Sequence, residues 1–406
     1  MTSRWLLLGA LGLAACGSDA APDPVDAAIP PSTPRMDGGA TDAGEVGPSD
    51  AGAPDASAPS GPPVVEVVAS GLIRPWAIAF LPDGRALVTT RVGDLYVLAR
   101  DGQVSEPLQG VPEVHARGQG GLLDVVAGPS FDEDRLVYFC YAAADASGAS
   151  GTELARARFT EGGLEDVQRL FAVEPKVRGG SNHYGCRIAF SGSGHLFLGV
   201  GDRFGFLDEA QNLGNHLGKV LRLNPDGSVP TDNPFVGRSD ARDEIWSYGH
   251  RNIQGMATHP ATGEVWTHEH GPRGGDEVNR PAPGANHGWP VVSYGDHYDG
   301  RPIPDDHAGR GFAEPVHFWT PSIAPSGMVF YDGELFPEWQ GDLLVGALAF
   351  THLARLEIDG ASVLSESRLL DDRGQRIRDV TVGPEGAIYV VTDAVDGQIL
   401  RITRSP

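Results

Sequence analysis

The chain has 406 residues and a formal net charge of −23, and it contains 55 Gly and 32 Pro. This acidity argues against nucleic acid or an anionic membrane surface as the partner, and it is compatible with a neutral ligand, a cationic ligand or bound Ca²⁺. The length would suit two or three ordinary domains, although a large closed β fold can use this much chain as one.

The N-terminus predicts an export signal. Arg4 is followed by a short apolar run, 5–13, which is too short to cross a bilayer as a mature helix. The letters LAAC at 13–16 resemble the lipobox of bacterial lipoproteins. By that resemblance, residues 1–15 are a signal peptide, and Cys16 becomes the first mature residue and carries lipid. No Asp follows Cys16 directly, which by analogy with enteric sorting favours the outer membrane, facing the periplasm. An ordinary cleaved signal that happens to contain Cys is the alternative.

Residues 16–62 predict a flexible linker. They are rich in Ala, Pro, Asp, Gly and Ser, show no apolar periodicity and hold Arg35 as their only cation. Such a segment cannot bury enough surface to fold, so we expect a self-repelling tether ahead of a domain at 63–406. With Cys16 lipidated, Cys140 and Cys186 remain. An exported protein can form a disulfide between them, and two buried free thiols are the alternative.

From residue 64 onward one pattern recurs six times. An alternating apolar strand runs into a turn with Gly or Pro, and a second apolar strand follows. The pairs are 76–80 with 86–90, 122–126 with 136–139, 187–190 with 196–200, 256–259 with 265–267, 327–331 with 343–346, and 380–382 with 388–391. Third strands follow several pairs, at 95–98, 220–223, 352–356 and 398–402.

This repetition predicts an all-β fold, a six-bladed β-propeller with four-stranded blades. The first strand, 64–68, is expected to complete the last blade and so close the ring. A β-sandwich is the alternative, but six similar hairpin units argue against it. In a propeller the loops of one face converge on the central channel, so residues far apart in the sequence can share one site.

The segment 266–290, with the sequence WTHEHGPRGGDEVNRPAPGANHGWP, predicts a cation-binding loop. It is too rich in Gly and Pro for a helix interior, and its polarity argues against a core strand. Calcium takes carboxylate and carbonyl oxygens in flexible geometry, which such a loop supplies. The alternative is a solvated surface loop. The ionisable residues in the segment include His268, Glu269, His270, Asp276, Glu277 and His287.

Polar groups stand directly before four of the predicted inner strands. They are Gln119 before the second, His183 before the third, Arg251 and Asn252 before the fourth, and Arg376 and Arg378 before the sixth. A histidine in this position can act as a general base. Arginine forks suit carboxylates or a developing oxyanion.

Each of these signals has a structural alternative when taken alone. His183 could be structural, Arg251 could pair with Glu244, and the Arg376 and Arg378 pair could be a solvated edge balanced by nearby Asp residues (Asp371, Asp372 and Asp379). Because the groups fall at equivalent positions, we expect them to face one mouth. A ligand with several carboxylates and a chelating edge would fit that mouth.

The motifs also carry a family resemblance. GQGGLLD, SNHYGCR, EIWSYGHRN, EHGPRGGDE, NHGWP and DRGQRIRDV resemble those of soluble aldose sugar dehydrogenases that depend on pyrroloquinoline quinone (PQQ), in the glucose/sorbosone dehydrogenase family of six-bladed propellers. The likeness covers residues 64–404 in order. It implies PQQ- and calcium-dependent oxidation of aldose sugars at the anomeric carbon to lactones, with a hydride passed to PQQ and electrons to an external acceptor.

The resemblance also implies a role for individual residues. His183 looks like the general base, and Arg251 with Asn252 looks like the pair that stabilises charge on the quinone oxygen. The further cofactor contacts would be Gln119, Tyr298, Arg376 and Arg378. The carbonyls of Gly271 and Pro272 look like ligands of the calcium that also grips PQQ. Glu277 and the backbone at His287 look like ligands of a second, structural calcium.

Three positions depart from the family pattern. Ala349 stands where many relatives carry Lys, so one cation for the cofactor is missing. His287 stands where Tyr is usual, and Cys186, beside the His183 loop, stands where Gly is common. Two other functions compete with the dehydrogenase. One is a calcium-dependent propeller hydrolase of sugar lactones, which does not need the three arginines Arg251, Arg376 and Arg378. The other is a non-catalytic binding propeller on a lipid anchor.

Overall fold

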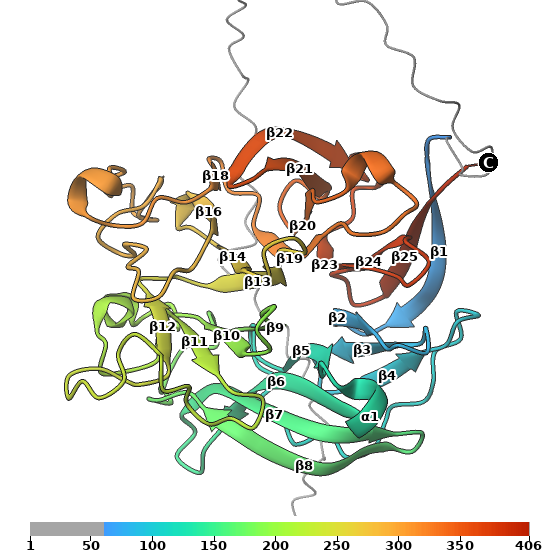
Figure 1. The fold of residues 1–406 in the computed structure, drawn as a ribbon, viewed down its shortest axis with the longest axis horizontal. Helices are drawn as coiled ribbons and strands as arrows, with labels where there is room; N and C mark the ends of the chain where they lie inside the picture. Colours follow the sequence, from blue (N-terminus) through green and yellow to red (C-terminus); the bar gives the residue numbers. More distant parts are fainter. Residues whose placement is uncertain (1–60, 406) are drawn as a thin grey trace, which may run out of the picture. The chain divides into compact units, whose positions relative to one another are not determined.

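The computed structural model describes residues 61–405, so the predicted signal peptide, Cys16 and almost all of the predicted linker lie outside the described residues. Six antiparallel sheets are arranged around a central axis, and they form the six-bladed β-propeller that the repeats predict (Figure 1). Among residues 61–405, no helix is long and apolar enough to span a membrane.

The blades follow one another in chain order, each with its innermost strand first. Blade 1 holds β2 (Pro75–Phe80), β3 (Ala86–Thr90) and β4 (Leu95–Leu98), and blade 2 holds β5 (Leu122–Ala127), β6 (Leu136–Ala144), β7 (Ser150–Thr160) and β8 (Gly163–Ala172). Blade 3 holds β9 (Gly185–Phe190), β10 (Leu196–Val200), β11 (Lys219–Leu223) and β12 (Ile245–Tyr248). Blade 4 holds β13 (Ile253–Thr258), β14 (Val265–Glu269), β16 (Asp276–Asn279) and β18 (His317–Trp319).

The last two blades repeat the arrangement. Blade 5 holds β19 (Pro325–Phe330), β20 (Leu343–Ala347), β21 (Leu353–Asp359) and β22 (Ser362–Leu369). Blade 6 holds β23 (Ile377–Val382), β24 (Ile388–Thr392), β25 (Gly397–Arg404) and β1 (Pro63–Leu72). A short ribbon of β15 (Arg273–Gly274) and β17 (Gly295–Asp296) stands outside the blades. The helical turns are α1 (Phe131–Asp134), η1 (Leu207–Gln211), η2 (Ala308–Arg310), η3 (Pro337–Trp339) and η4 (Asp371–Arg373).

Closure of the ring follows the prediction. β1 pairs antiparallel with β25, from Pro63 opposite Arg404 to Leu72 opposite Gly397, so the first described strand completes the last blade (Figure 1). Each innermost strand also contacts the next, and β23 contacts β2, which makes the ring continuous. Ring closure covers strand edges that would otherwise offer unpaired backbone groups.

Blade 1 has only three regular strands, and an irregular segment stands in place of its fourth. Ser105 donates its backbone N–H to Val97 O at 2.9 Å, and Leu108 donates to Leu95 O at 2.7 Å. The edge of β4 is therefore covered without a regular strand.

The inner strands are joined at the axis by a buried ion-pair network. Arg187 on β9 lies 3.3 Å from Asp124 on β5 and 3.1 Å from Asp379 on β23. Its guanidinium also lies over the ring of Trp76 on β2 at 4.0 Å. This one side chain connects blade 3 to blades 1, 2 and 6 and fixes their relative positions around the channel.

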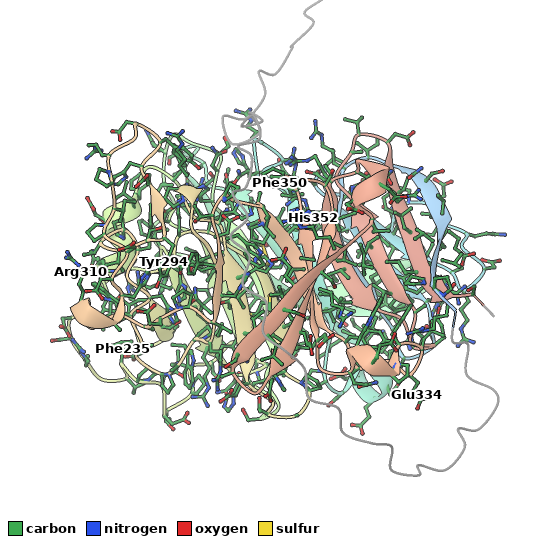
Figure 2. All side chains as sticks on the ribbon, turned by 90° about the horizontal axis from the view of Figure 1, so that it is seen from above. Phe235, Tyr294, Arg310, Glu334, Phe350 and His352 are labelled. Atoms are coloured by element: carbon green, nitrogen blue, oxygen red, sulfur yellow. A yellow bond between two sulfur atoms is a disulfide. The ribbon has the colours of Figure 1, made fainter. Side chains whose placement is uncertain are left out.

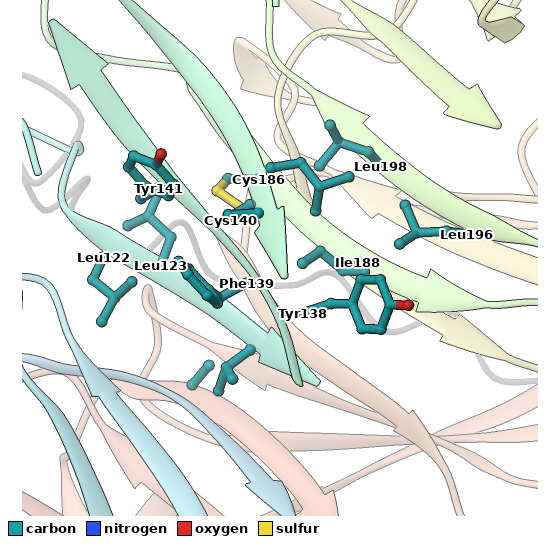
Figure 3. Packing of buried hydrophobic residues seen from close by; sticks show 14 of the residues in the cluster. Leu122, Leu123, Tyr138, Phe139, Cys140, Tyr141, Cys186, Ile188, Leu196 and Leu198 are labelled. Carbon is teal, nitrogen blue, oxygen red and sulfur yellow. A yellow bond between two sulfur atoms is a disulfide. The ribbon is translucent and has the colours of Figure 1, made fainter. Parts of the chain in front are cut away.

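The two remaining cysteines form a disulfide, which settles the alternative that the sequence left open. Cys140 on β6 is bonded to Cys186 on β9, so the bridge joins blade 2 to blade 3. Figure 3 shows it among the buried apolar side chains of the two blades, including Tyr141 and Leu198.

The two faces of the propeller carry different connections. In each blade the first hairpin turn lies on one face, and the segment that leads into the next inner strand lies on the other, because successive strands run antiparallel. Figure 2 labels one residue on each face. Phe350, in the β20–β21 connection, lies on one face, and Glu334, in the β19–β20 connection, lies on the opposite face. We call the face that carries Phe350 and the segments before the inner strands the mouth face.

The interpretation of 266–290 as too polar for core strands is wrong in part. Residues 265–269 and 276–279 are buried strands of blade 4, and Thr267, His268 and Asp276 are 0% exposed. The polarity is tolerated in part because the carboxylates find partners inside the protein, as a buried polar group requires, whereas Thr267 Oγ1 and both ring nitrogens of His268 have none among residues 61–405. Glu269, for example, accepts hydrogen bonds from His250 and Asn279.

Candidate active site

His183 lies at the mouth face, directly before β9, as the sequence predicts. Its backbone has φ 52, its side chain is 1% exposed, and its Nδ1 lies 2.7 Å from Oδ1 of Asp202. Asp202 follows β10 of the same blade, and its Oδ2 accepts a hydrogen bond from the indole N–H of Trp289 at 2.8 Å. The imidazole is therefore held by a buried carboxylate that is itself fixed from blade 4.

The electrostatics of this pair favour a neutral imidazole beside a charged carboxylate. Burial and the positive charge of Arg251 lower the pKa of His183, although Asp202 opposes them. Burial alone would raise the pKa of Asp202, but His183 and Arg251 outweigh it and the pKa is lowered. Because Nδ1 is committed to Asp202, Nε2 is the nitrogen that can take a proton from a ligand.

Arg251 lies directly before β13 and is 3% exposed. Its guanidinium donates to His270 O and to the hydroxyl of Tyr298, both at 3.0 Å. Its Nε is buried and has no hydrogen-bond partner among residues 61–405. The alternative pairing with Glu244 does not form, because the carboxylate of Glu244 lies against His216 instead. An unsatisfied cationic donor at this place is suited to an anionic ligand.

Gln119 and Asn252, two of the predicted cofactor contacts, hydrogen-bond to the backbone around His183. Gln119 accepts the backbone N–H of His183 with its Oε1 at 2.8 Å. Asn252 is 1% exposed, and its Oδ1 accepts the backbone N–H of Gly185 at 3.3 Å. Direct contact of either residue with a cofactor stays a prediction.

Arg376 and Arg378 share one carboxylate, Asp393, at the end of β24. The Nη2 of Arg376 lies 3.1 Å from Asp393 Oδ2, and that of Arg378 lies 2.8 Å from the same oxygen. Burial would raise the pKa of Asp393, but Arg378 and Arg376 hold it far below its usual value. The side chain of Arg378 is only 8% exposed, and its Nε has no partner among the described residues. Asp393, which the alternative did not include, therefore supplies a balancing charge to both arginines.

The buried His270 links these groups to one region. Burial lowers its pKa to about 3, and the positive charges of Arg251, Arg378 and, when it is protonated, His183 act in the same direction. The Nε2 of His270 lies 2.6 Å from Pro325 O, at the start of blade 5. Groups from blades 3, 4, 5 and 6 therefore converge around this residue.

Ala349, which stands where many relatives carry Lys, lies beside the same arginines. The backbone N–H of Ala349 donates to Ile323 O at 2.9 Å, and the preceding carbonyl, Leu348 O, accepts from Arg376 Nη1 at 3.3 Å. A longer side chain at 349 would thus start next to the arginine pair, as the family pattern implies.

Two glutamates of blade 4 form the candidate cation site. Glu269 and Glu277 lie directly opposite each other on β14 and β16, and both are buried. Burial raises the pKa of Glu277, and the charge of Glu269 adds to the effect against the opposing pull of His307. Like charges opposite each other on a sheet are destabilising, so a cation between them would be favoured.

Both glutamates line a small cleft of about 10 Å³, room for one water-sized group. The other lining residues are Arg251, His270, Gly271, Gly275, His287, Trp289, Val292 and Ser293. Among residues 61–405, no three His, Cys, Asp or Glu side chains are grouped as a metal site. A cation here would therefore need backbone oxygens as well, which is the donor set that calcium accepts.

The other predicted metal residues lie around this cleft. The N–H of Gly271 donates to Asp276 Oδ1 at 2.9 Å, and the carbonyl oxygens of Gly274 and Gly275 crowd the space where a Gly271 side chain would stand. Pro272 is buried in the turn between β14 and β15. The ring of His287 is stacked on that of His250, with centroids 4.5 Å apart. Neither ring nitrogen of His287 has a hydrogen-bond partner within 61–405.

Three contributors were missed at the sequence level. Asp202 and Asp393 each follow the second strand of a blade, in GDR at 201–203 and VTD at 391–393. An acidic residue leaving a second strand at the mouth face, opposite a basic residue entering the inner strand, is the signal that could have found both. Trp289 lies within the NHGWP motif, and no local pattern indicates that its indole reaches Asp202.

The fold and these residues define the class of protein: a six-bladed propeller whose mouth holds a histidine–carboxylate pair, partnerless arginine donors and a site suited to a cation. The sequence model described as "Glucose / Sorbosone dehydrogenase" matches residues 72–401. The chain is also 43% identical over 344 residues to the aldose sugar dehydrogenase YliI of Escherichia coli (strain K12), covering 84% of this chain and 92% of that protein. The chain therefore belongs to the glucose/sorbosone dehydrogenase family, and it is an enzyme of the oxidoreductase class.

Solved structures agree with this assignment. A glucose dehydrogenase crystal structure, 44% identical, superposes with a TM-score of 0.81 and covers 84% of this chain and 100% of that chain. The PQQ-bound aldose sugar dehydrogenase of Streptomyces coelicolor, 28% identical, superposes with a TM-score of 0.70 and covers 85% of this chain and 100% of that chain.

Proposed function

We propose that this protein oxidises aldose sugars at the anomeric carbon to lactones, with PQQ and calcium as cofactors, and passes the electrons to an external acceptor. The proposal is supported by its relatives, which are named as an aldose sugar dehydrogenase and, in one structure, as a PQQ-bound form. The single observation that carries it in this chain is the His183–Asp202 pair beside the partnerless Nε of Arg251.

The residues fit a carboxylated quinone. PQQ is a tricarboxylate, and Arg251 and Arg378 each keep a buried N–H donor without a partner among the described residues. Arg376 and the hydroxyl of Tyr298 would complete the polar surround, with Gln119 and Asn252 as further proposed contacts. When bound, PQQ supplies the hydride acceptor, which no amino-acid side chain provides.

The residues also fit calcium. We propose that the carbonyls of Gly271 and Pro272 hold one calcium beside PQQ, and that Glu277 and the backbone at His287 hold a second. The cleft between Glu269 and Glu277 supports this, because it offers buried negative charge and little room. A calcium ion at the first position would polarise an oxygen of the bound cofactor.

The chain's own residues would perform three tasks. His183 takes the proton of the anomeric hydroxyl at Nε2, because Asp202 holds the other nitrogen and the ring is neutral. Asp202 stabilises the imidazolium that this transfer creates. Arg251, which is 3% exposed, would direct its cationic donors from this buried position at the place where negative charge develops.

Reconstitution tests the proposal. The purified protein, titrated with PQQ and Ca²⁺, is expected to reduce a dye when aldoses are added, and His183→Ala is expected to abolish turnover. His183→Ala should still bind PQQ, since its side chain is not among the proposed cofactor contacts. Full dye reduction without added or co-purified PQQ would end the proposal.

We further propose that the enzyme is exported and held at the cell envelope by lipid on Cys16, with 17–62 as tether. Fractionation of cells expressing the full chain tests this directly. The wild type should sediment with membranes and Cys16→Ala should not, whereas equal distribution of both would contradict the anchor.

A further inference from the structure

A turn beside His183 presents an aromatic side chain to the mouth. Phe204 follows Asp202 and is 39% exposed, although it is a large apolar residue. Its ring meets that of His183 edge to face, with centroids 5.1 Å apart, and lies 6.2 Å from the ring of Tyr298. Phe204 belongs to none of the hydrophobic clusters of the described residues, whereas Phe206, two residues on, packs against the core.

The backbone of this turn is strained and firmly held. Arg203 and Phe204 have φ 58 and φ 63, the left-handed region that favours glycine. The N–H of Phe204 donates to Asp202 Oδ1 at 2.8 Å. Arg203 donates to Asn182 O at 3.0 Å, and its guanidinium lies 3.8 Å from the centre of the Tyr184 ring. Strain of this kind persists only where surrounding contacts impose it, and it concentrates at functional sites.

One carboxylate oxygen of Asp202 therefore fixes both the His183 imidazole and the backbone of Phe204. Asp202 Oδ1 is 2.7 Å from Nδ1 of His183 and accepts the N–H of Phe204. The exposed ring and the imidazole consequently keep a constant relation to each other. Apart from its ring contacts with His183 and Tyr298, Phe204 packs against no hydrophobic cluster of the described residues, so its exposed surface is available to a ligand at the mouth.

We infer that Phe204 is the specificity-determining platform for the sugar, an inference that rests on the proposed function. A pyranose ring has an apolar face of C–H bonds, and such a face packs well on an aromatic ring. Packed on Phe204, the sugar would have its anomeric hydroxyl near Nε2 of His183. The platform would favour aldopyranoses whose C–H face is uninterrupted, and it would act mainly through substrate binding.

Kinetics of the PQQ- and Ca²⁺-loaded enzyme test the inference. Phe204→Ala should raise KM for D-glucose about tenfold, which corresponds to about 1.4 kcal/mol, a magnitude typical of an aromatic contact. It should change kcat much less, and Phe204→Trp should restore KM. Phe350→Ala is the matched control, because Phe350 is also on the mouth face, 45% exposed and left-handed at φ 59. That control should leave KM within about twofold.

A second measurement separates this inference from the proposed function. Saturation-transfer NMR should show magnetisation passing from the protein to the C–H protons of D-glucose in the wild type, and this signal should be lost in Phe204→Ala. Because Phe204 has φ 63, Phe204→Gly should melt at or above the wild-type temperature, and that result would show that the fold does not need the ring. An unchanged KM and an unchanged NMR signal in Phe204→Ala would overturn the inference. Wild-type NMR transfer without any turnover of aldoses would instead overturn the proposed function.

Discussion

At the scale of single residues, the arrangement depends on Asp202. This buried carboxylate contacts His183, Trp289 and Phe204, so it orients the proposed base and the turn beside it. Its negative charge also raises the pKa of His183, against the lowering by burial and by Arg251.

Asp202→Asn is therefore expected to reduce kcat by about 100-fold or more, because the amide can neither fix the tautomer reliably nor stabilise the imidazolium. The pH profile should move as well. The proposed base works when it is deprotonated, so activity falls as the pH drops through the pKa of His183. Without the carboxylate that pKa falls further, and the acid limb of kcat/KM should shift to lower pH. An unshifted limb with wild-type kcat would contradict the role of Asp202.

At the scale of elements, the pairing of β14 with β16 places two carboxylates together. Glu269 and Glu277 are opposite each other, and their repulsion in the calcium-free protein costs up to about 1 kcal/mol. Glu277→Gln should consequently melt higher than the wild type in the presence of a chelator and lower than the wild type in excess Ca²⁺. Thermal denaturation of both proteins in both buffers measures this crossover. Parallel shifts in the two buffers would exclude Glu277 as a calcium ligand.

A second element-scale feature is the disulfide between β6 and β9. Cys140 and Cys186 are 46 residues apart in the sequence, and Cys186 lies three residues after His183. Replacing both with Ala is expected to lower the free energy of unfolding by about 2–4 kcal/mol. Urea denaturation with and without reductant checks this value. Reductant should destabilise the wild type and leave the double variant unchanged; equal urea midpoints for the two proteins would argue against a stabilising bridge.

At the scale of the whole molecule, β1 closes the propeller. Its pairing with β25 joins the first and last described strands, so a chain that begins at residue 75 would expose the edge of β25. We expect that shorter chain to lose cooperative unfolding, whereas a chain that begins at residue 61 should keep it. Circular dichroism melts of the two chains measure the difference, and identical melts would contradict the closing role of β1.

The propeller could be predicted from the sequence because its signal is local and repeated. Six apolar hairpins with Gly or Pro turns specify blades, and 64–68 stood out as an extra strand that needed a partner. The site could be predicted only in part. His183 and Arg251 carry motif signals, but Asp202 and Trp289 act through contacts between blades that no local pattern encodes. The prediction of a loop over 266–290 was wrong in part, because the sequence of a buried polar strand resembles that of a loop until its hydrogen-bond partners are known.

We propose that groups from several blades form one cationic cradle for PQQ beside His183. A crystal structure of the protein loaded with PQQ and Ca²⁺ would show whether this cradle holds the cofactor. We expect PQQ to lie at the mouth face, in contact with the guanidinium groups of Arg251 and Arg378 and within reach of the His183 imidazole. PQQ bound elsewhere on the molecule, or an empty mouth at saturating PQQ and Ca²⁺, would contradict it.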